Sequence, residues 1–136
     1  MTTVAVSGYF MYLHKGHVRL FKAAKELGDK LVVIVNSDAQ QKMKKGKIIM
    51  PEEDRVELIS AIRYVDEVVV AIDEDRTVCK TLEKVKPDIF ANGGDRVDGN
   101  VPEADTCKKN GIEMRYNVGG EKVDSSSRIF DELSKV

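Results

Sequence analysis

The stretch that decides the fold is KLVVIVNS, residues 30–37, in which five apolar residues follow one another without a polar interruption. A strand with one face in water alternates apolar and polar residues. An unbroken apolar run rich in β-branched residues is instead typical of a parallel strand that helices cover on both faces. The run therefore predicts a buried strand of a parallel sheet.

Strand-like and helix-like segments alternate on both sides of this run. Further strands are expected over 3–8, 66–72, 88–94 and 112–118, and helices over 17–27, from Pro51 to Ile62, and over 77–86, 102–111 and 125–136. The segment QQKMKKGKIIM, residues 40–50, has no clear period and is expected to be a loop. The alternation predicts one α/β domain over residues 1–136, with a Rossmann-like five-stranded parallel sheet and helices on both faces.

Composition and charge narrow the classes of function. The chain has 136 residues, 42% of them hydrophobic and 33% charged, and a formal net charge of -1. Such a balance argues against nucleic-acid or membrane-surface partners, so any anion must be bound by a local site. No apolar run is long enough to span a bilayer, and the start lacks the pattern of a signal peptide. The two cysteines, Cys79 and Cys107, form no CxxC pair, and we expect reduced thiols in a cytoplasmic protein.

Glycines and basic residues gather where the expected strands end. The first strand is followed by GYFMYLHKGH, the second by NSDAQQKMKKGK, the fourth by NGGDR and the fifth by GGEKVDSSSR. In parallel α/β sheets, ligands bind beyond the carboxyl ends of the strands. We therefore expect a phosphate site assembled from several loops.

Both histidines of the chain, His14 and His17, lie in the first of these segments. His17 falls at an expected helix N-terminus, where free N–H groups and the helix dipole favour an anion. Gly16 removes a side chain between them, so a ligand can approach the backbone. Two histidines with no cysteine or acidic residue at a ligand-like spacing are a weak zinc site. A pair that grips a phosphoryl group and two incidental loop histidines remain as alternatives.

The segment GYFMYLHKGH resembles the HxGH signature of the nucleotidyltransferase superfamily, usually written GxFDxxHxGH. Four further segments resemble, in order, blocks of glycerol-3-phosphate cytidylyltransferase and of the bacterial adenylyltransferase that makes ADP-heptose. These segments are KELGDKLVVIVNSD, EDRVELISAIRYVDEVV, KPDIFANGGD and SSSRI, and the likeness covers about residues 3 to 133.

The resemblance implies a nucleotidyltransferase. Such an enzyme transfers a nucleoside monophosphate from a triphosphate to a phosphorylated alcohol or sugar, by in-line attack and without a covalent enzyme intermediate, and releases pyrophosphate. CMP transfer from CTP is favoured here, with AMP transfer from ATP and a non-catalytic nucleotide-binding regulatory domain as alternatives. The resemblance also implies Mg²⁺ held by phosphate oxygens and water, and a homodimer.

The resemblance assigns roles to individual residues. The catalytic group comprises His14, His17 and a lysine that closes over the phosphates, with Lys45 favoured over Lys44. The residues expected to bind the nucleotide are Gly8, Tyr9, Phe10, Gly16, Arg63, Gly93, Gly94, Asp95, Ser125, Ser126 and Ser127. Those expected to bind the acceptor are Asp38, Arg55, Lys122 and Arg128, and no residue is predicted to bind a metal directly.

The residues by themselves also allow plainer roles. Arg55 and Arg63 are eight apart on one expected helix, where surface salt bridges are the alternative. The lysines can be a solvated loop, NGGDR a turn, and the three serines helix N-caps.

The chain departs from the family pattern at two places. Met11 stands where the family usually has aspartate, and a thioether cannot accept hydrogen bonds as a carboxylate does. The last block lacks the Arg-Thr-x-Gly of the cytidylyltransferases, so Lys122 or Arg128 is expected to supply the positive charge.

Overall fold

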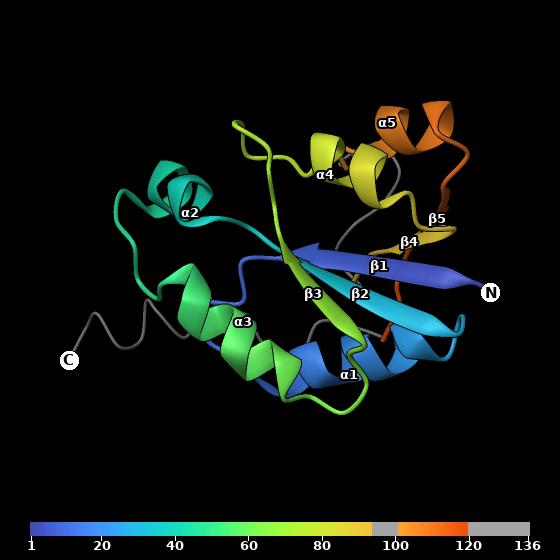
Figure 1. Cartoon of the computed structure of the whole chain (residues 1–136), viewed down its shortest axis with the longest axis horizontal. Coiled ribbons are helices and arrows are strands. Elements are labelled where there is room, and N and C mark those ends of the chain that lie inside the picture. Colours follow the sequence, from blue (N-terminus) through green and yellow to red (C-terminus); the bar gives the residue numbers. More distant parts are fainter. Residues whose placement is uncertain (94–100, 120–136) are drawn as a thin grey trace.

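One five-stranded sheet with helices on both faces forms the protein (Figure 1). The computed structural model describes residues 1–93 and 101–119. Its strands are β1 (Thr3–Gly8), β2 (Lys30–Val35), β3 (Glu67–Val70), β4 (Ile89–Ala91) and β5 (Glu113–Arg115). Its helices are α1 (Lys15–Lys25), α2 (Asp38–Lys45), α3 (Glu52–Ser60), α4 (Cys79–Val85) and α5 (Ala104–Lys109). The helix expected over 125–136 lies outside the described residues.

The strands are all parallel, in the order β3-β2-β1-β4-β5, which confirms the predicted Rossmann-like α/β fold. The run 31–35 occupies β2 and is completely or almost completely buried, as its unbroken apolar pattern predicted. β1 and β2 pair over six residues, from Thr3 opposite Lys30 to Gly8 opposite Val35.

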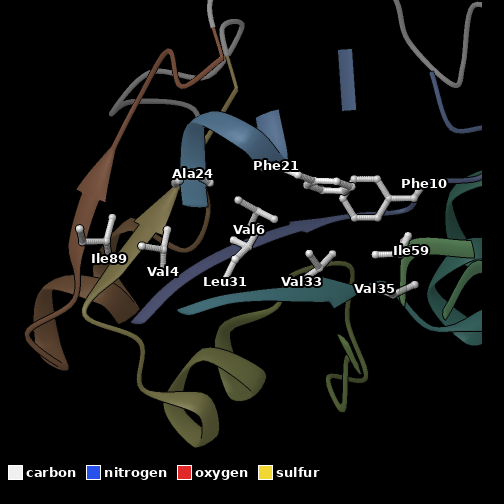
Figure 2. Close-up of a cluster of buried hydrophobic side chains, with 11 residues drawn as sticks. Val4, Val6, Phe10, Phe21, Ala24, Leu31, Val33, Val35, Ile59 and Ile89 are labelled. Carbon is white, nitrogen blue, oxygen red and sulfur yellow. The ribbon is translucent and has the colours of Figure 1, made fainter. Parts of the chain in front are cut away.

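Two apolar cores lie on opposite faces of the sheet. The first joins alternate residues of β1 and β2 to Phe21 and Ala24 of α1 and Ile59 of α3 (Figure 2). The second joins the remaining faces, including Ala5 and Ile34, to side chains of α4 and α5. Because β1 and β2 feed both cores, their side chains are apolar at every position from Val4 to Val6 and from Leu31 to Val35.

The expectation of a loop over 40–50 is wrong for its first half, because residues 38–45 form α2. Ser37 and Gln40 cap the start of this helix reciprocally, and Gly46 closes its end with φ 79°. Its buried positions are Gln40 and Gln41, which pack through hydrogen bonds. A search for apolar periodicity therefore cannot detect this helix.

The helix expected from Pro51 to Ile62 is shorter in the structure. α3 ends at Ser60, and the N–H groups of Ala61 and Ile62 bond three residues back, to Leu58 and Ile59. This tightening turns the chain so that it can enter β3.

No helix in the described part of the chain is both long and apolar enough to cross a bilayer. Both cysteines are free, Cys79 half-buried and Cys107 buried. Burial raises the pKa of the Cys107 thiol to about 11, so this thiol stays protonated at neutral pH.

Candidate active site

The strand order reverses beside β1. The chain moves outward from β1 to β2 and β3, and then returns to place β4 on the other side of β1 (Figure 1). At such a point, parallel α/β folds bind ligands beyond the carboxyl ends of the strands. Residues 9–17 follow β1 and residues 92–93 follow β4, so the histidines lie where this fold binds ligands.

His14 begins helix α1 and is fixed by it. It is the N-cap residue, and its Nδ1 accepts the N–H of Gly16 at 3.1 Å. A ring nitrogen that accepts a hydrogen bond carries no proton, so this bond assigns the neutral tautomer with its proton on Nε2. The imidazole thereby has its donor on the nitrogen that points away from the helix cap.

His17, the third residue of α1, stacks on His14, with ring centroids 3.9 Å apart and 23° between the ring planes. On its other side, Phe10 meets its ring edge-on at 5.0 Å. Both imidazoles therefore sit in the first turn of α1, where the helix N-terminus favours an anion. The structure brings the two predicted catalytic histidines together.

Phe10 supports the histidines from the core. The residue is 4% exposed, and its ring centroid lies 5.4 Å from that of Phe21 (Figure 2). Its contact with a nucleotide stays a prediction. Its φ of 49° is in the left-handed region, where a non-glycine residue is strained. Gly8 allows this turn, because a Cβ there would lie 2.7 Å from the Phe10 ring. Met11 is 1% exposed, so its thioether is packed inside the protein.

The two predicted catalytic lysines are carried by a helix. Lys44 and Lys45 form the last turn of α2, where positive charge suits the helix dipole. The ammonium of Lys44 lies 4.4 Å above the ring of Tyr9, in the segment that leads to the histidines. Lys45 is half-buried. Which of the two lysines closes over the phosphates stays a prediction, with Lys45 favoured by the sequence.

Arg55 is completely buried, with an exposure of 0%. Its guanidinium donates to the carbonyls of Met50 at 2.9 Å, Tyr9 at 2.8 Å and Asn36 at 2.6 Å, and to the carboxylate of Asp38 at 3.1 Å. Burial lowers the pKa of Arg55, and the bond to Asp38 opposes this shift. Acceptor binding by Arg55 stays a prediction, since four of its five N–H donors bond to the protein in this structure.

Asp38 joins the N-termini of two helices. Its carboxylate accepts the N–H of Glu52 at 2.7 Å, and the Glu52 carboxylate accepts the N–H of Asp38 at 2.8 Å. Each acidic side chain thus caps the other helix, which explains why Pro51 needs no side-chain cap of its own. Acceptor binding by Asp38 also stays a prediction.

Arg63 is not brought to the histidines. It lies in the turn after α3 rather than on the helix with Arg55, and its exposed side chain donates to the Tyr64 hydroxyl at 2.9 Å. Three residues later, Asp66 bonds to Leu31 at the start of β2, so Arg63 lies at the amino-terminal edge of the sheet. The expectation that the two arginines share one helix is wrong, because the chain must turn before β3.

Of the residues predicted in the later loops, only Gly93 is described. It follows β4, and within the described residues a Cβ there would meet nothing within 4 Å. The predictions outside the described residues concern Gly94, Asp95, Lys122, Ser125, Ser126, Ser127 and Arg128.

Sequence reasoning missed Gln40 and Gln41. The Gln40 carboxamide donates to the carbonyls of Asp75 at 2.7 Å and Thr77 at 2.8 Å. The Gln41 carboxamide makes three hydrogen bonds with backbone groups of Ile49 and Met50. The pattern Ser37-x-x-Gln40 is a capping-box signature, which could have located the helix that carries them.

Within residues 1–93 and 101–119, no three His, Cys, Asp or Glu side chains gather closely enough to hold a metal ion. The described site instead offers imidazoles, a helix N-terminus and nearby ammonium groups. These groups suit the binding of a polyphosphate, because they combine hydrogen-bond donors with positive charge.

Comparison with known proteins shows the family of this chain. A family model described as Cytidylyltransferase-like matches residues 5–129. The FAD synthase of Ferroglobus placidus is 41% identical, in a match that covers 98% of this chain and 88% of that protein. A solved structure, the lipopolysaccharide core biosynthesis protein from Thermoplasma volcanium, has a TM-score of 0.68 and 37% identity, and the match covers 85% of this chain and 93% of that chain.

Two further relatives are longer than the matched region. The FAD synthase of Pyrococcus abyssi is 47% identical over 68% of this chain, but the match spans only 63% of that protein. The bifunctional protein HldE of Streptomyces coelicolor is 45% identical over 79% of this chain and 23% of its own length. The family model nevertheless matches nearly the whole chain, and the chain therefore belongs to the cytidylyltransferase-like family of HxGH nucleotidyltransferases.

Proposed function

We propose that this protein transfers AMP from ATP to a phosphorylated small molecule and releases pyrophosphate. The observation that carries this proposal is the 41% identity to an FAD synthase over 98% of the chain. FAD synthases are adenylyltransferases that act on FMN. The relatives therefore support the adenylyl alternative over the cytidylyl transfer that the sequence favoured, and FMN is the first acceptor to test.

The reaction is an exchange at one phosphorus atom. A phosphate oxygen of the acceptor forms a bond to the α-phosphorus of ATP as the bond from that phosphorus to the bridging oxygen of the β-phosphate breaks. The electron pair of the broken bond leaves with pyrophosphate. Such a transfer depends on alignment and on charge stabilisation more than on acid–base chemistry.

The described residues supply both requirements. His14, held as the neutral tautomer by the N–H of Gly16, offers its Nε2–H to a phosphate oxygen. His17 stacks against it in the same helical turn, so the two rings bind adjacent oxygens. The N-terminus of α1 adds its dipole to these donors.

The lysines at the end of α2 add positive charge near the leaving pyrophosphate. Lys44 lies 4.4 Å above the ring of Tyr9, in the segment that leads to the histidines. Mg²⁺ bound to ATP would be held by phosphate oxygens and water, and would neutralise phosphate charge. We further expect a cytoplasmic homodimer with no nucleic-acid or membrane partner.

The test measures pyrophosphate release by the purified protein with Mg²⁺. ATP and CTP are each combined with FMN, glycerol 3-phosphate or a sugar phosphate. We expect release with ATP and FMN, and formation of FAD. Release with CTP but not with ATP would overturn the adenylyl proposal, and nucleotide binding without release with any acceptor would favour a regulatory domain.

The histidine variant tests the site. We expect His17→Ala to lower kcat by about 10²- to 10³-fold, as loss of one donor to a transition-state oxygen does in other enzymes. The matched control is Lys30→Gln at the opposite edge of the sheet, where Lys30 pairs with Glu67. Undiminished turnover by His17→Ala would remove His17 from the mechanism.

A further inference from the structure

Arg55 is bonded to three segments that surround the candidate site. Its Nη1 donates to Tyr9, which precedes the histidines, and to Asn36, which follows β2. Its Nε donates to Met50, at the end of the connection from α2 to α3. One planar guanidinium reaches all three carbonyls because its donors point in fixed, divergent directions.

The bond to Met50 extends the connection to the lysine helix. Gln41, on α2, donates from Nε2 to the same Met50 carbonyl at 2.9 Å and accepts the N–H of Met50 at 3.1 Å. Lys44 lies one turn later on α2. A continuous route of hydrogen bonds therefore runs from α2, through Gln41, Met50 and Arg55, to Tyr9.

Because Arg55 is buried, its guanidinium depends on the protein for all its hydrogen-bond partners. A charged group removed from water is destabilising unless its donors are satisfied, and loss of one partner leaves the others uncompensated. Arg55 has one carboxylate partner, Asp38, and three carbonyl partners, and it is 0% exposed. If the segments of Tyr9, Asn36 and Met50 moved apart, the guanidinium would lose these hydrogen bonds. Water would not replace them, because the guanidinium is enclosed.

We infer that Arg55 is a positioning residue, which fixes the lysine helix α2 relative to the histidine segment. This inference rests on the proposed function, in which the histidines and a lysine act on one triphosphate. It differs from the expectation that Arg55 binds the acceptor, because the guanidinium would act through its bonds to Tyr9, Asn36 and Met50.

The decisive variants are Arg55→Gln and Arg55→Lys. Glutamine removes the charge and most of the donors, whereas lysine keeps the charge but offers its donors from a single point. We expect Arg55→Gln to lower kcat by about 10²-fold, the cost of misplacing catalytic groups by roughly 1 Å, with a smaller effect on the KM for either substrate. Arg55→Lys should fall between Arg55→Gln and the unchanged protein.

The matched control is Ile59→Ala, one turn later on the same helix and buried in the apolar core. This change destabilises α3 without altering a bond of the guanidinium. We expect its kcat, corrected for the folded fraction measured by chemical denaturation, to stay unchanged. An equal loss in Ile59→Ala would mean that Arg55 acts only through stability and would overturn the inference.

Kinetics separate positioning from direct binding. A raised KM for FMN with an unchanged kcat in Arg55→Gln, restored by Arg55→Lys, would show that the cation binds acceptor phosphate and would overturn the positioning role.

Hydrogen–deuterium exchange tests the same inference without relying on activity. We expect Arg55→Gln to speed exchange in residues 9–17 and 41–50 together, whereas Ile59→Ala does not single out these two segments. If the unchanged protein releases no pyrophosphate, the proposed function fails while this measurement still decides the role of Arg55. Unaltered exchange in both segments would overturn the inference.

Discussion

The two edges of the sheet use polar side chains in opposite ways. At the amino-terminal edge, charged side chains pair with one another at the surface, as Lys25 does with Asp66 and Lys30 with Glu67. At the carboxyl-terminal edge, Arg55, Gln40 and Gln41 are buried and bond mainly to backbone carbonyls and N–H groups. The first set is screened by water, whereas the second has no solvent to replace a lost partner.

This difference indicates where a substitution will affect function. Exposed ion pairs contribute little to stability, because water and salt weaken them and two long side chains lose freedom. Buried polar groups with every partner in place hold a single geometry and tolerate change poorly. The edge that carries the histidines is therefore the rigid one, and three substitutions test the contrast.

The largest effect is expected from Phe10→Leu at the carboxyl-terminal edge. Phe10 packs on Phe21 in the core and meets His17 edge-on, so the change removes core contacts and a support of the imidazole. The matched variant is Phe21→Leu, which removes contacts of the same core. Truncation of a buried phenylalanine to alanine costs about 3 to 5 kcal/mol of the free energy of unfolding, and leucine, which keeps part of the side chain, costs less.

We expect both phenylalanine variants to lose similar stability in chemical denaturation, while Phe10→Leu loses more kcat per folded molecule. Equal losses of kcat in the two variants would show that Phe10 serves the core alone.

An intermediate effect is expected from Gln41→Met, which keeps the size of the side chain and removes its carboxamide. The N–H groups of Ile49 and Met50 lose their acceptor inside the protein. Each unsatisfied buried group costs about 1 to 3 kcal/mol of the free energy of unfolding. Chemical denaturation measures the loss, and the exposed neighbour Lys42→Met is the control. A loss no greater than that of Lys42→Met would contradict the rigid-edge description.

The smallest effect is expected from Asp66→Asn at the amino-terminal edge. The hydrogen bond from Lys25, helped by the N–H of Leu31, lowers the pKa of Asp66 below its ordinary value of 3.8. The folded state therefore favours the carboxylate, and this contribution is present above about pH 4 and lost as the pH falls through the lowered pKa. The Asp66 side chain is 40% exposed, so screening keeps the contribution below about 1 kcal/mol.

Denaturation from pH 7 to pH 2 checks this prediction. The difference in free energy of unfolding between the unchanged protein and Asp66→Asn should be constant near neutrality and disappear at the acid end. A difference that grows as the pH falls would reverse the sign of the linkage.

The sequence predicted the strands well because their signal is local. The apolar runs at 3–8 and 30–37 appear as β1 and β2, and the histidine pair appears at the start of α1. α2 was missed because its buried face consists of Gln40 and Gln41, which satisfy distant backbone groups rather than an apolar core. No periodicity of hydrophobic residues records such bonds.

The two arginines show the same limit at the site. Both lie in one family block, and the sequence predicted that both share one helix and bind ligands. Only the fold separates them, since Arg55 lies enclosed at the carboxyl-terminal edge while Arg63 lies exposed beyond the end of α3. Strands of this length span about 20 Å, so opposite edges of one sheet are far apart.

The sequence alone determined that this chain forms a parallel α/β sheet with paired histidines beyond its first strand. Apolar pattern, glycines and family motifs all act over short stretches of chain, so they can be read in order. The tertiary structure decided which polar groups reach water and which are enclosed. Arg55 holds three segments because residues 9, 36 and 50 converge on it, and that convergence depends on how the strands and helices pack.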